Sequence, residues 1–500
     1  MNFMYLDQSN YNTVDFDVKL EIVSKDRFFD SAKKYISMDK ETLLHRQALF
    51  SDILKIDGLS SFLTALSEKL AEYAPLMQQH VQATDNEEKL HNILYPTVYI
   101  ELVRFIYDFL YDQKDKITAA SLKYLLELSE NEVNSDEYKR LNSYYEKNAQ
   151  VLRSISSVTV GVNLNALLQP KEAGIVSLNN EEFKSGDLID RIIKLDFEND
   201  GYHCIAPLSV IDKKLGYHES QQVNYSMLKA MGKILDSGLT HCSNRSLKYI
   251  KEKLFVYFDL LESLKFVVEA INRIEILKNK GAPLCFPKIS NDRSFSVISL
   301  YDNNLLRVKT KKEVVPNTIL LDNDVCCYIL TGPNSGGKTV FINSLAAAQY
   351  YFQLGMPIPA TEASLPICDA IFKISVEEQA NVNWAGRFEK ECISLSEVLK
   401  RFTKNSLALI DEAFTSTSAV EAVPIAANFI SELCKKDGKC VFITHHHELS
   451  DEQPQIAECG EKIGYLHTQL DGERRTYEIQ RGKFESNSYA QSIAKKYGLL

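Results

Sequence analysis

The chain has 500 residues, of which 45% are hydrophobic and 25% are charged, a composition typical of a folded globular protein rather than a disordered one. Its net charge of −10 excludes a uniformly basic nucleic-acid binder, so any contact with nucleic acid has to come from a local surface. A chain of this length is expected to form about two to four domains.

Targeting signals are not evident in the sequence. No apolar stretch approaches the length of a membrane span, and residues 1–17 carry acids where a signal peptide needs basic residues followed by an apolar core. We therefore expect a soluble, cytoplasmic protein that does not contact a membrane. The ten cysteines form no C-x-x-C pair and are interpreted as reduced core residues.

The first part of the chain is expected to be helical. Apolar residues recur at three- and four-residue steps in residues 59–79, 91–113, 119–130 and 133–154. From residue 156 to about 207 the pattern changes to short β-branched or alternating runs, which predict a small strand-bearing insertion.

A helical pattern returns over residues 223–279. Its apolar stripe predicts one long packed helix, and it comprises Leu254, Tyr257, Leu261, Leu264, Val268 and Ile271. Such a stripe is more often core than partner surface. The residues Gly281, Ala282 and Pro283 end the pattern, and we place a domain boundary there.

The segment VCCYILTGPNSGGKT at residues 325–339 predicts a phosphate-binding loop between a buried strand and a helix. Gly332, Gly337, Lys338 and Thr339 have the G-x-x-x-x-G-K-[ST] spacing, in which backbone amides surround a polyphosphate. The lysine supplies a positive charge to the β- and γ-oxygens, and the threonine hydroxyl is a ligand for Mg²⁺. The helix that follows directs its positive end at the anion.

A second apolar run, LALI at residues 407–410, ends in Asp411 and Glu412. The run predicts a buried parallel strand that delivers carboxylates at its carboxyl end. Asp411 would hold Mg²⁺ and Glu412 would polarise the attacking water. The alternative is a strand end with two solvated acids, which is disfavoured by the phosphate loop elsewhere in the chain.

A third strand is predicted over residues 440–444, and three histidines, 445–447, follow it. Neighbouring residues on an extended chain point to opposite faces, so all three histidines cannot bind one ion. A zinc site is therefore less economical than a single histidine that senses the γ-phosphate beside the strand of Asp411.

Together these segments resemble the ATPase domain of the MutS family of DNA mismatch-repair proteins. The resemblance is carried by TGPNSGGKT at 331–339, by Asp411-Glu412, by THHHEL at 444–449 and by GMPIPA at 355–360. Further similarity is found at Val315-Pro316-Asn317 and in the closing segment, with Ser488, Tyr489, Ala490, Ala494, Gly498 and Leu499.

The resemblance implies an ATP- and Mg²⁺-dependent hydrolase and a role for each matching residue. Asn317 would lie against the adenine, Thr339 and Asp411 would bind magnesium, and Asp411, Glu412 and His445 would support hydrolysis. The remaining nucleotide-binding positions are those of the loop: Gly332, Pro333, Asn334, Ser335, Gly336, Gly337, Lys338 and Thr339.

The resemblance also implies a composite site in a homodimer. In the family, a serine-threonine-phenylalanine element reaches the partner's γ-phosphate, and the matching stretch here is Gly386-Arg387-Phe388. Because glycine has no hydroxyl, we expect Arg387, or the amides that begin the following helix, to replace the serine. The alternative is an exposed arginine at the start of a helix.

By the same resemblance, residues 39–47 open a lever domain and the insertion corresponds to a clamp. A sheet that only buttresses the helices is the alternative for the insertion. We expect four parts: a helical lever or core at 1–155, the insertion at 156–215, long lever helices at 216–282, and an α/β P-loop ATPase domain of the ABC type at 283–500. The family's mismatch-reading leading domain is not found, so direct mismatch reading is not expected.

The leading hypothesis is a DNA-dependent or DNA-modulated ATPase that forms a dimeric clamp in DNA repair or recombination. It would recognise DNA structure, such as branched duplex, rather than single mismatches. One alternative is an ABC-type ATP-driven switch or motor that acts on a protein partner. Another is a scaffold that binds ATP without hydrolysing it, but intact Lys338, Thr339, Asp411 and Glu412 favour hydrolysis.

Overall fold

The computed structural model describes residues 27–78, 85–153, 156–168, 170–182, 184–185, 203–204, 244–375, 386–415, 417–446, 448–449, 453–471 and 474–483. The chain divides into two compact units. The first comprises Met1–Ser60, Lys116–Leu122 and Ser263–Leu500, and the second comprises Ser61–Asp115 and Lys123–Glu262. Across the described ranges, no helix combines the length and the apolar character needed to span a membrane.

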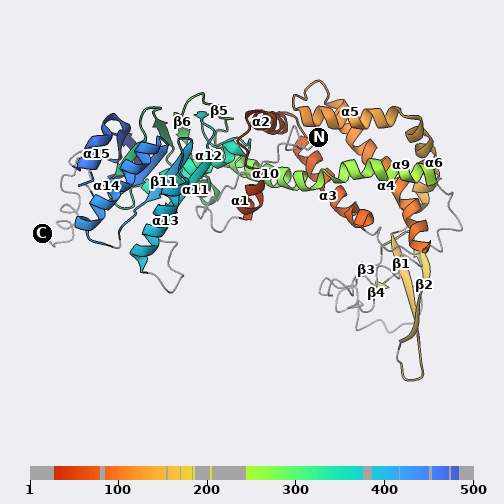
Figure 1. The fold of residues 1–500 in the computed structure, drawn as a ribbon. Helices are drawn as coiled ribbons and strands as arrows, with labels where there is room; N and C mark the ends of the chain where they lie inside the picture. The colour runs from red at the N-terminus through yellow and green to blue at the C-terminus, as the bar shows by residue number, and fades with distance from the viewer. Residues whose placement is uncertain are drawn as a thin grey trace. The chain divides into compact units, whose positions relative to one another are not determined.

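The second unit is built mainly of helices, as the spacing of apolar residues predicts. It contains most of α3 (Leu59–Gln78), with α4 (Asp85–Asp112), most of α5 (Ala120–Asn134), α6 (Asp136–Arg153) and α9 (Asn244–Phe258). Its insertion includes the antiparallel pair β1 (Ser157–Leu164) and β2 (Pro170–Asn179), labelled in Figure 1. A short parallel pair, β3 (Lys184–Ser185) and β4 (His203–Cys204), follows.

A buried carboxylate links three helices of the second unit. Glu132 on α5 is 2% exposed and accepts hydrogen bonds from the hydroxyls of Tyr99 (2.5 Å) and Tyr249 (2.6 Å). It also pairs with Lys253 on α9. Because a buried charge is tolerated only when it is paired and hydrogen-bonded, these contacts fix α4, α5 and α9 against one another.

The long helix predicted over residues 223–279 is interrupted. Residues 223–243 lie outside the described residues, and the rest forms α9 and α10 (Leu261–Asn279), separated by a turn at Asp259 and Leu260. Buried Tyr257, Leu260 and Leu264 keep a three- and four-residue spacing across that turn, so the apolar pattern alone does not reveal it. Helix α10 ends two residues before Gly281, which has a φ of 75°. The Gly281 amide donates to the Lys278 carbonyl and the Ala282 amide donates to the Leu277 carbonyl, and these two bonds close the helix.

The first unit begins with α1 (Arg27–Ala32), the short helix η3 (Lys33–Tyr35) and α2 (Lys40–Lys55). Helix α2 starts where Asp39 accepts a hydrogen bond from the Thr42 amide (2.8 Å), which satisfies one of the amides at the helix start. A four-stranded sheet follows α10, in the order β5 (Lys288–Ile289), β9 (Glu362–Leu365), β6 (Phe295–Leu300) and β7 (Asn317–Leu321). The helices α11 (Asn303–Val308) and η6 (Lys311–Glu313) connect β6 to β7.

A six-stranded sheet forms the rest of the first unit. Its order is β10 (Ala370–Ser375), β11 (Ser406–Asp411), β12 (Lys439–Ile443), β8 (Cys327–Thr331), β13 (Ile463–Asp471) and β14 (Arg474–Arg481). All neighbouring strands are parallel except the pair β13 and β14. Its helices are α12 (Lys338–Gln353), α13 (Arg387–Arg401), α14 (Ala419–Lys436), α15 (Pro454–Cys459) and η8 (Gly460–Lys462).

Helices cover this sheet, which explains why its central strands are apolar throughout. Every residue of β8, β11 and β12 is buried, as expected when both faces of a parallel sheet are packed. Helices α13 and α14, which lie beside β11 in Figure 1, contribute apolar residues to the same buried cluster as Ile329, Ile410 and Phe442. Helix α12 contacts β11 and β12.

Candidate nucleotide-binding site

Three neighbouring strands of the six-stranded sheet end beside one another. In the order β11, β12, β8, their carboxyl ends lead to Asp411-Glu412, to His445 and to the loop 332–337. In open α/β sheets, ligands bind at this edge of the sheet. The fold therefore brings together three segments that are more than 30 residues apart in the sequence.

The loop 332–337 leaves β8 and leads into α12. Gly332 has a φ of 138° and Gly337 a φ of 97°, conformations that favour glycine. A Cβ atom on Gly332 would lie 2.1 Å from Thr468 Oγ1, and one on Gly336 would lie 2.9 Å from Thr468 Cγ2. Thr468 on β13 therefore makes glycine necessary at both positions, a constraint that the motif does not reveal.

Lys338 is the first residue of α12, and its ammonium group lies inside the loop. Nζ donates hydrogen bonds to the carbonyl oxygens of Gly332 (2.8 Å) and Pro333 (3.2 Å) and lies 3.9 Å from Glu412 Oε1. Burial lowers the pKa of Lys338, and the charges of Glu412 and Asp411 oppose that shift. The side chain is 3% exposed, so its positive charge acts in a region of low dielectric constant.

Asp411 is the last residue of β11 and is 5% exposed. Burial raises the pKa of its carboxyl group, and a hydrogen bond from the Thr339 side chain opposes the shift. Within the described residues, Oδ1 of Asp411 has no hydrogen-bond partner. An unsatisfied buried carboxylate oxygen beside a threonine hydroxyl is the oxygen donor set that Mg²⁺ prefers, so these two residues fit that ion.

Glu412 follows Asp411 but has the opposite electrostatic environment. Its Oε1 lies 2.6 Å from His445 Nε2, and this close contact lowers the pKa of the Glu412 carboxyl group. The backbone of Glu412 has a φ of 54°, and its amide donates to the Ile443 carbonyl (3.2 Å). A left-handed glutamate is uncommon, and such strain is concentrated at functional sites.

The remaining histidines of the run are placed differently. The amide of His446 donates to the Thr444 hydroxyl (3.0 Å), and the Leu449 amide donates to the His446 carbonyl (3.1 Å). His447 lies outside the described residues, as does the closing segment from residue 484. Of the three histidines, His445 is the one that the structure places against Glu412.

Asn317, which was expected beside the adenine, is the first residue of β7 and contacts β14. Its Nδ2 donates to the Tyr477 carbonyl (3.1 Å), and its Oδ1 accepts from the Ile479 amide (2.8 Å). Tyr477 has a φ of 64° and is 47% exposed. Its Cα lies 3.7 Å from the point where a Cβ atom added to Gly337 would lie. The structure thus places an exposed aromatic residue beside the loop, which sequence reasoning missed.

Gly386 and Arg387, the proposed contacts to a partner subunit, begin α13. Gly386 is the N-cap residue, is exposed, and has open space where a Cβ would lie. The side chain of Arg387 lies outside the described residues. One turn later, the buried Glu391 accepts a hydrogen bond from the Phe414 amide (2.8 Å), so α13 is joined directly to the turn that follows Glu412.

Comparison with known proteins relates this domain to one family. Residues 328–499 match the family model described as MutS domain V. Among similar proteins is the DNA mismatch repair protein MutS of Streptococcus suis, 27% identical over 255 residues, a match covering 50% of this chain and 30% of that protein. The protein of the same name from Clostridium perfringens is 28% identical over 300 residues, covering 53% of this chain and 33% of that protein.

A third protein of that name, from Staphylococcus carnosus, is 26% identical over 244 residues, covering 49% of this chain and 27% of that protein. The chain thus spans a third or less of the length of these relatives.

The opposite environments of Asp411 and Glu412 lead to a stability prediction. Replacing Asp411 with Asn should stabilise the nucleotide-free protein at pH 7 by about 1 kcal/mol, because it removes an unsatisfied buried charge. Since burial raises the Asp411 pKa above its ordinary 3.8, ionisation destabilises the fold only above that value. The gain, measured by thermal unfolding, should vanish below about pH 3.8, where the aspartate is protonated in both the folded and the unfolded chain.

Glu412→Gln is the matched control for this experiment. The contact with His445 lowers the Glu412 pKa, so the charged carboxylate stabilises the fold above its ordinary value of 4.5. Loss of the Glu412 charge should leave the unfolding temperature of the protein unchanged or lower it at pH 7. An Asp411→Asn protein that melts below the wild type at pH 7 would contradict the assigned environment.

Proposed function

We propose that this chain, which belongs to the MutS family, is a DNA-modulated ATP hydrolase that acts as a dimeric clamp. One observation carries the proposal most directly. Asp411, Glu412 and His445 lie at the same edge of a parallel sheet as the glycine-rich loop that holds Lys338. A lysine, two carboxylates and a histidine at this place match the needs of phosphoryl transfer to water.

In this proposal, the loop 332–337 binds the triphosphate. Its backbone amides and the start of α12 face an anion, and the Lys338 ammonium supplies a point charge to the β- and γ-oxygens. The contributing positions are Gly332, Pro333, Asn334, Ser335, Gly336, Gly337 and Lys338, with Asn317 supporting the adjacent strand β14. Thr339 and Asp411 would hold Mg²⁺, which when bound neutralises charge that develops on the phosphate oxygens.

Hydrolysis requires an oriented water molecule, and Glu412 is the residue proposed to hold it. Because the contact with His445 lowers the Glu412 pKa, the side chain is a carboxylate at neutral pH and accepts a hydrogen bond from water. A carboxylate with a lowered pKa is a weak base. We therefore assign Glu412 mainly an orienting role and His445 the role of fixing the position of Glu412.

The proposed target is DNA, recognised through its structure rather than through a single mismatch. The name of the relatives, DNA mismatch repair protein MutS, supports a DNA substrate, and this chain matches only part of each of them. The antiparallel pair β1 and β2 is the proposed clamp element. A homodimer would place Gly386 and Arg387 of one protomer near the γ-phosphate of the other.

The proposal is tested by ATP turnover with forked DNA, a Holliday junction and plain duplex across a salt series. Branched DNA should stimulate wild-type turnover, and the stimulation should fall steeply with salt because phosphate contacts release counterions. Glu412→Gln should reduce turnover by roughly 100-fold, about 2.7 kcal/mol, and should keep ATP binding. Glu432→Gln, a change of the same chemistry on an exposed ion pair of α14, should leave turnover unchanged.

ATP turnover that is the same with and without each DNA would contradict a DNA target and would favour a protein partner. ATP binding without measurable turnover in the wild type would favour the scaffold.

The contribution of Arg387 to a partner's site leads to a separate prediction. Arg387→Ala should lower turnover about tenfold or more at protein concentrations that allow dimers, because a positive charge near the γ-phosphate stabilises the transition state. Arg401→Ala, at the other end of α13, serves as the control. Equal turnover of the Arg387→Ala and Arg401→Ala proteins would contradict a role for Arg387 in the composite site.

A further inference from the structure

A cavity of about 250 Å³ lies at the edge of the six-stranded sheet opposite to the phosphate loop. Its walls include Ser406, the first residue of β11, and Lys439, the first residue of β12. The same two strands end at Asp411 and at the segment of His445. Because β11 has six residues, about 16 Å of strand separates the cavity from the candidate nucleotide site.

Three further segments complete the walls: residues 289–295 between β5 and β6, residues 366–368 after β9, and residues 404–405 before β11. The segment after β9 is held by the phosphate-loop helix. Gln353 on α12 is fully buried, donates to the Cys368 carbonyl (2.9 Å) and accepts from the Cys368 amide (3.1 Å). Paired amide hydrogen bonds of this kind fix the wall of the cavity without a ligand.

The lining carries more cations than carboxylates. Arg293, Lys404 and Lys439 line the cavity together with one carboxylate, Asp292. Asp292 accepts hydrogen bonds from the hydroxyl (2.5 Å) and the amide (2.9 Å) of Ser294 and from the Ser290 hydroxyl (2.8 Å), and these bonds lower its pKa to about 2. A second carboxylate, Asp369, lies behind the lining and accepts a hydrogen bond from the Ser406 hydroxyl (2.7 Å). Among the lining residues themselves, the three cations outnumber the one carboxylate.

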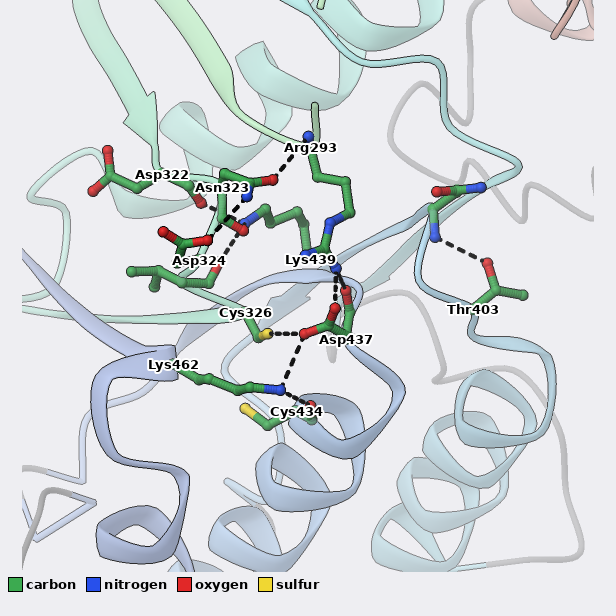
Figure 2. A network of polar contacts seen from close by, with 12 residues as sticks. Arg293, Asp322, Asn323, Asp324, Cys326, Thr403, Cys434, Asp437, Lys439 and Lys462 are labelled. Carbon is green, nitrogen blue, oxygen red and sulfur yellow. Dashed lines mark hydrogen bonds and ion pairs between the residues drawn. The ribbon is translucent and has the colours of Figure 1, made fainter. Parts of the chain in front are cut away.

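Figure 2 shows how two of these cations are held. Lys439 donates to the carbonyl oxygens of Asp322, Asn323 and Val325, and no carboxylate of the described residues lies within salt-bridge distance of it. Burial lowers the pKa of Lys439 to about 8, and the charges of Asp437 and Asp322 oppose that shift.

Arg293 is fixed by Asp437, to which its Nη1 donates, and its amide bonds to Asn323 Oδ1 (3.2 Å). Asp437 is shared, since Lys462 also contacts it at 3.1 Å. One carboxylate between two cations leaves net positive charge beside the cavity.

Other donors on the walls are not used within the protein. Within the part of the chain that the structure describes, the Lys404 ammonium and the side-chain amides of Asn291 and Asn405 have no hydrogen-bond partner. Arg293 uses only Nη1 in the contact with Asp437, so Nε and Nη2 remain for another acceptor. An arginine held in place with spare donors, beside a lysine that no other described group engages, is an arrangement that can bind oxyanions.

We propose that this cavity is a second anion site, which binds a phosphate group as the free ion or as a small phosphate ester. Arg293 and Lys404 contact the oxygens, Asn291 and Asn405 add neutral donors, and Lys439 contributes charge from behind. The cavity volume limits the ligand to a small one, because pockets for drug-sized ligands begin at roughly 300 Å³. An anion there would connect the starts of β6, β11 and β12, the last two of which carry Asp411 and His445 at their other ends.

The site is tested by titrating inorganic phosphate, and separately glycerol phosphate, against Lys338→Ala protein at constant ionic strength with chloride as the balancing anion. The lysine change removes the phosphate loop as a competing site. Isothermal titration calorimetry should show saturable binding, and adding Lys404→Ala should weaken it about tenfold, the effect of one charge-assisted contact. Adding Lys400→Ala, an exposed lysine of α13 that does not line the cavity, should change nothing.

The two ligands separate the two sources: tighter binding of the ester identifies a phosphorylated small molecule, and tighter binding of the ion identifies free phosphate. If the Lys338→Ala protein does not fold, wild type and Lys404→Ala are compared instead, both saturated with a non-hydrolysable ATP analogue. Absence of saturable binding, or equal affinity with and without Lys404, overturns the proposal, and either result leaves the assignment of the nucleotide site unaffected.

Discussion

The parallel pairing of β11, β12 and β8 is the constraint on which the candidate site depends. Each strand is buried from end to end, so its polar residues lie at the ends of the strand rather than in its middle. Because parallel strands finish at one edge, the loop, the carboxylates and the histidine meet there although the sequence separates them. A shift of β12 relative to β11 by one residue would turn its apolar side chains to the other face and separate His445 from Glu412.

Charge at this edge is divided between two adjacent carboxylates. Burial raises the pKa of Asp411, whereas the contact with His445 lowers the pKa of Glu412. Asp411 is thus held in a state that a cation would stabilise, and Glu412 is held ionised and in a fixed orientation. The hydrogen bond from Phe414 to Glu391 extends this arrangement to α13, the helix that begins at the proposed contact with a partner subunit. Movement of α13 would therefore reach the turn of Glu412 directly.

The strands, the loop and most residues of the candidate site can be predicted from the sequence, because the patterns that mark them are local. An apolar run followed by glycines and a lysine marks a strand, a turn and a helix, and four apolar residues before two acids mark the end of a buried strand. The similarity to the MutS family follows from those segments, and residues 328–499 match the model of MutS domain V. The division of the helices near Asp259 was not predictable, because the apolar spacing continues through the turn.

Residues that are placed at the site by the pairing of distant strands cannot be predicted from local patterns. Thr468 and Tyr477 lie on β13 and β14, and only the pairing of β13 with β8 brings Thr468 against the glycines of the loop. The side chain of Asn317, a residue that the resemblance places near the nucleotide base, joins β7 to β14, and the sequence does not reveal that pairing. The cavity at the opposite edge likewise combines residues from four segments, none of which carries a recognisable motif.

Equilibrium binding of magnesium-ATP to the wild type and to Lys338→Ala measures the central claim most directly. The account predicts saturable binding to the wild type and at least tenfold weaker binding to the variant, because a buried ammonium group would be lost from the phosphate contacts. Equal affinity of the two proteins, or no saturable binding to the wild type, would contradict it.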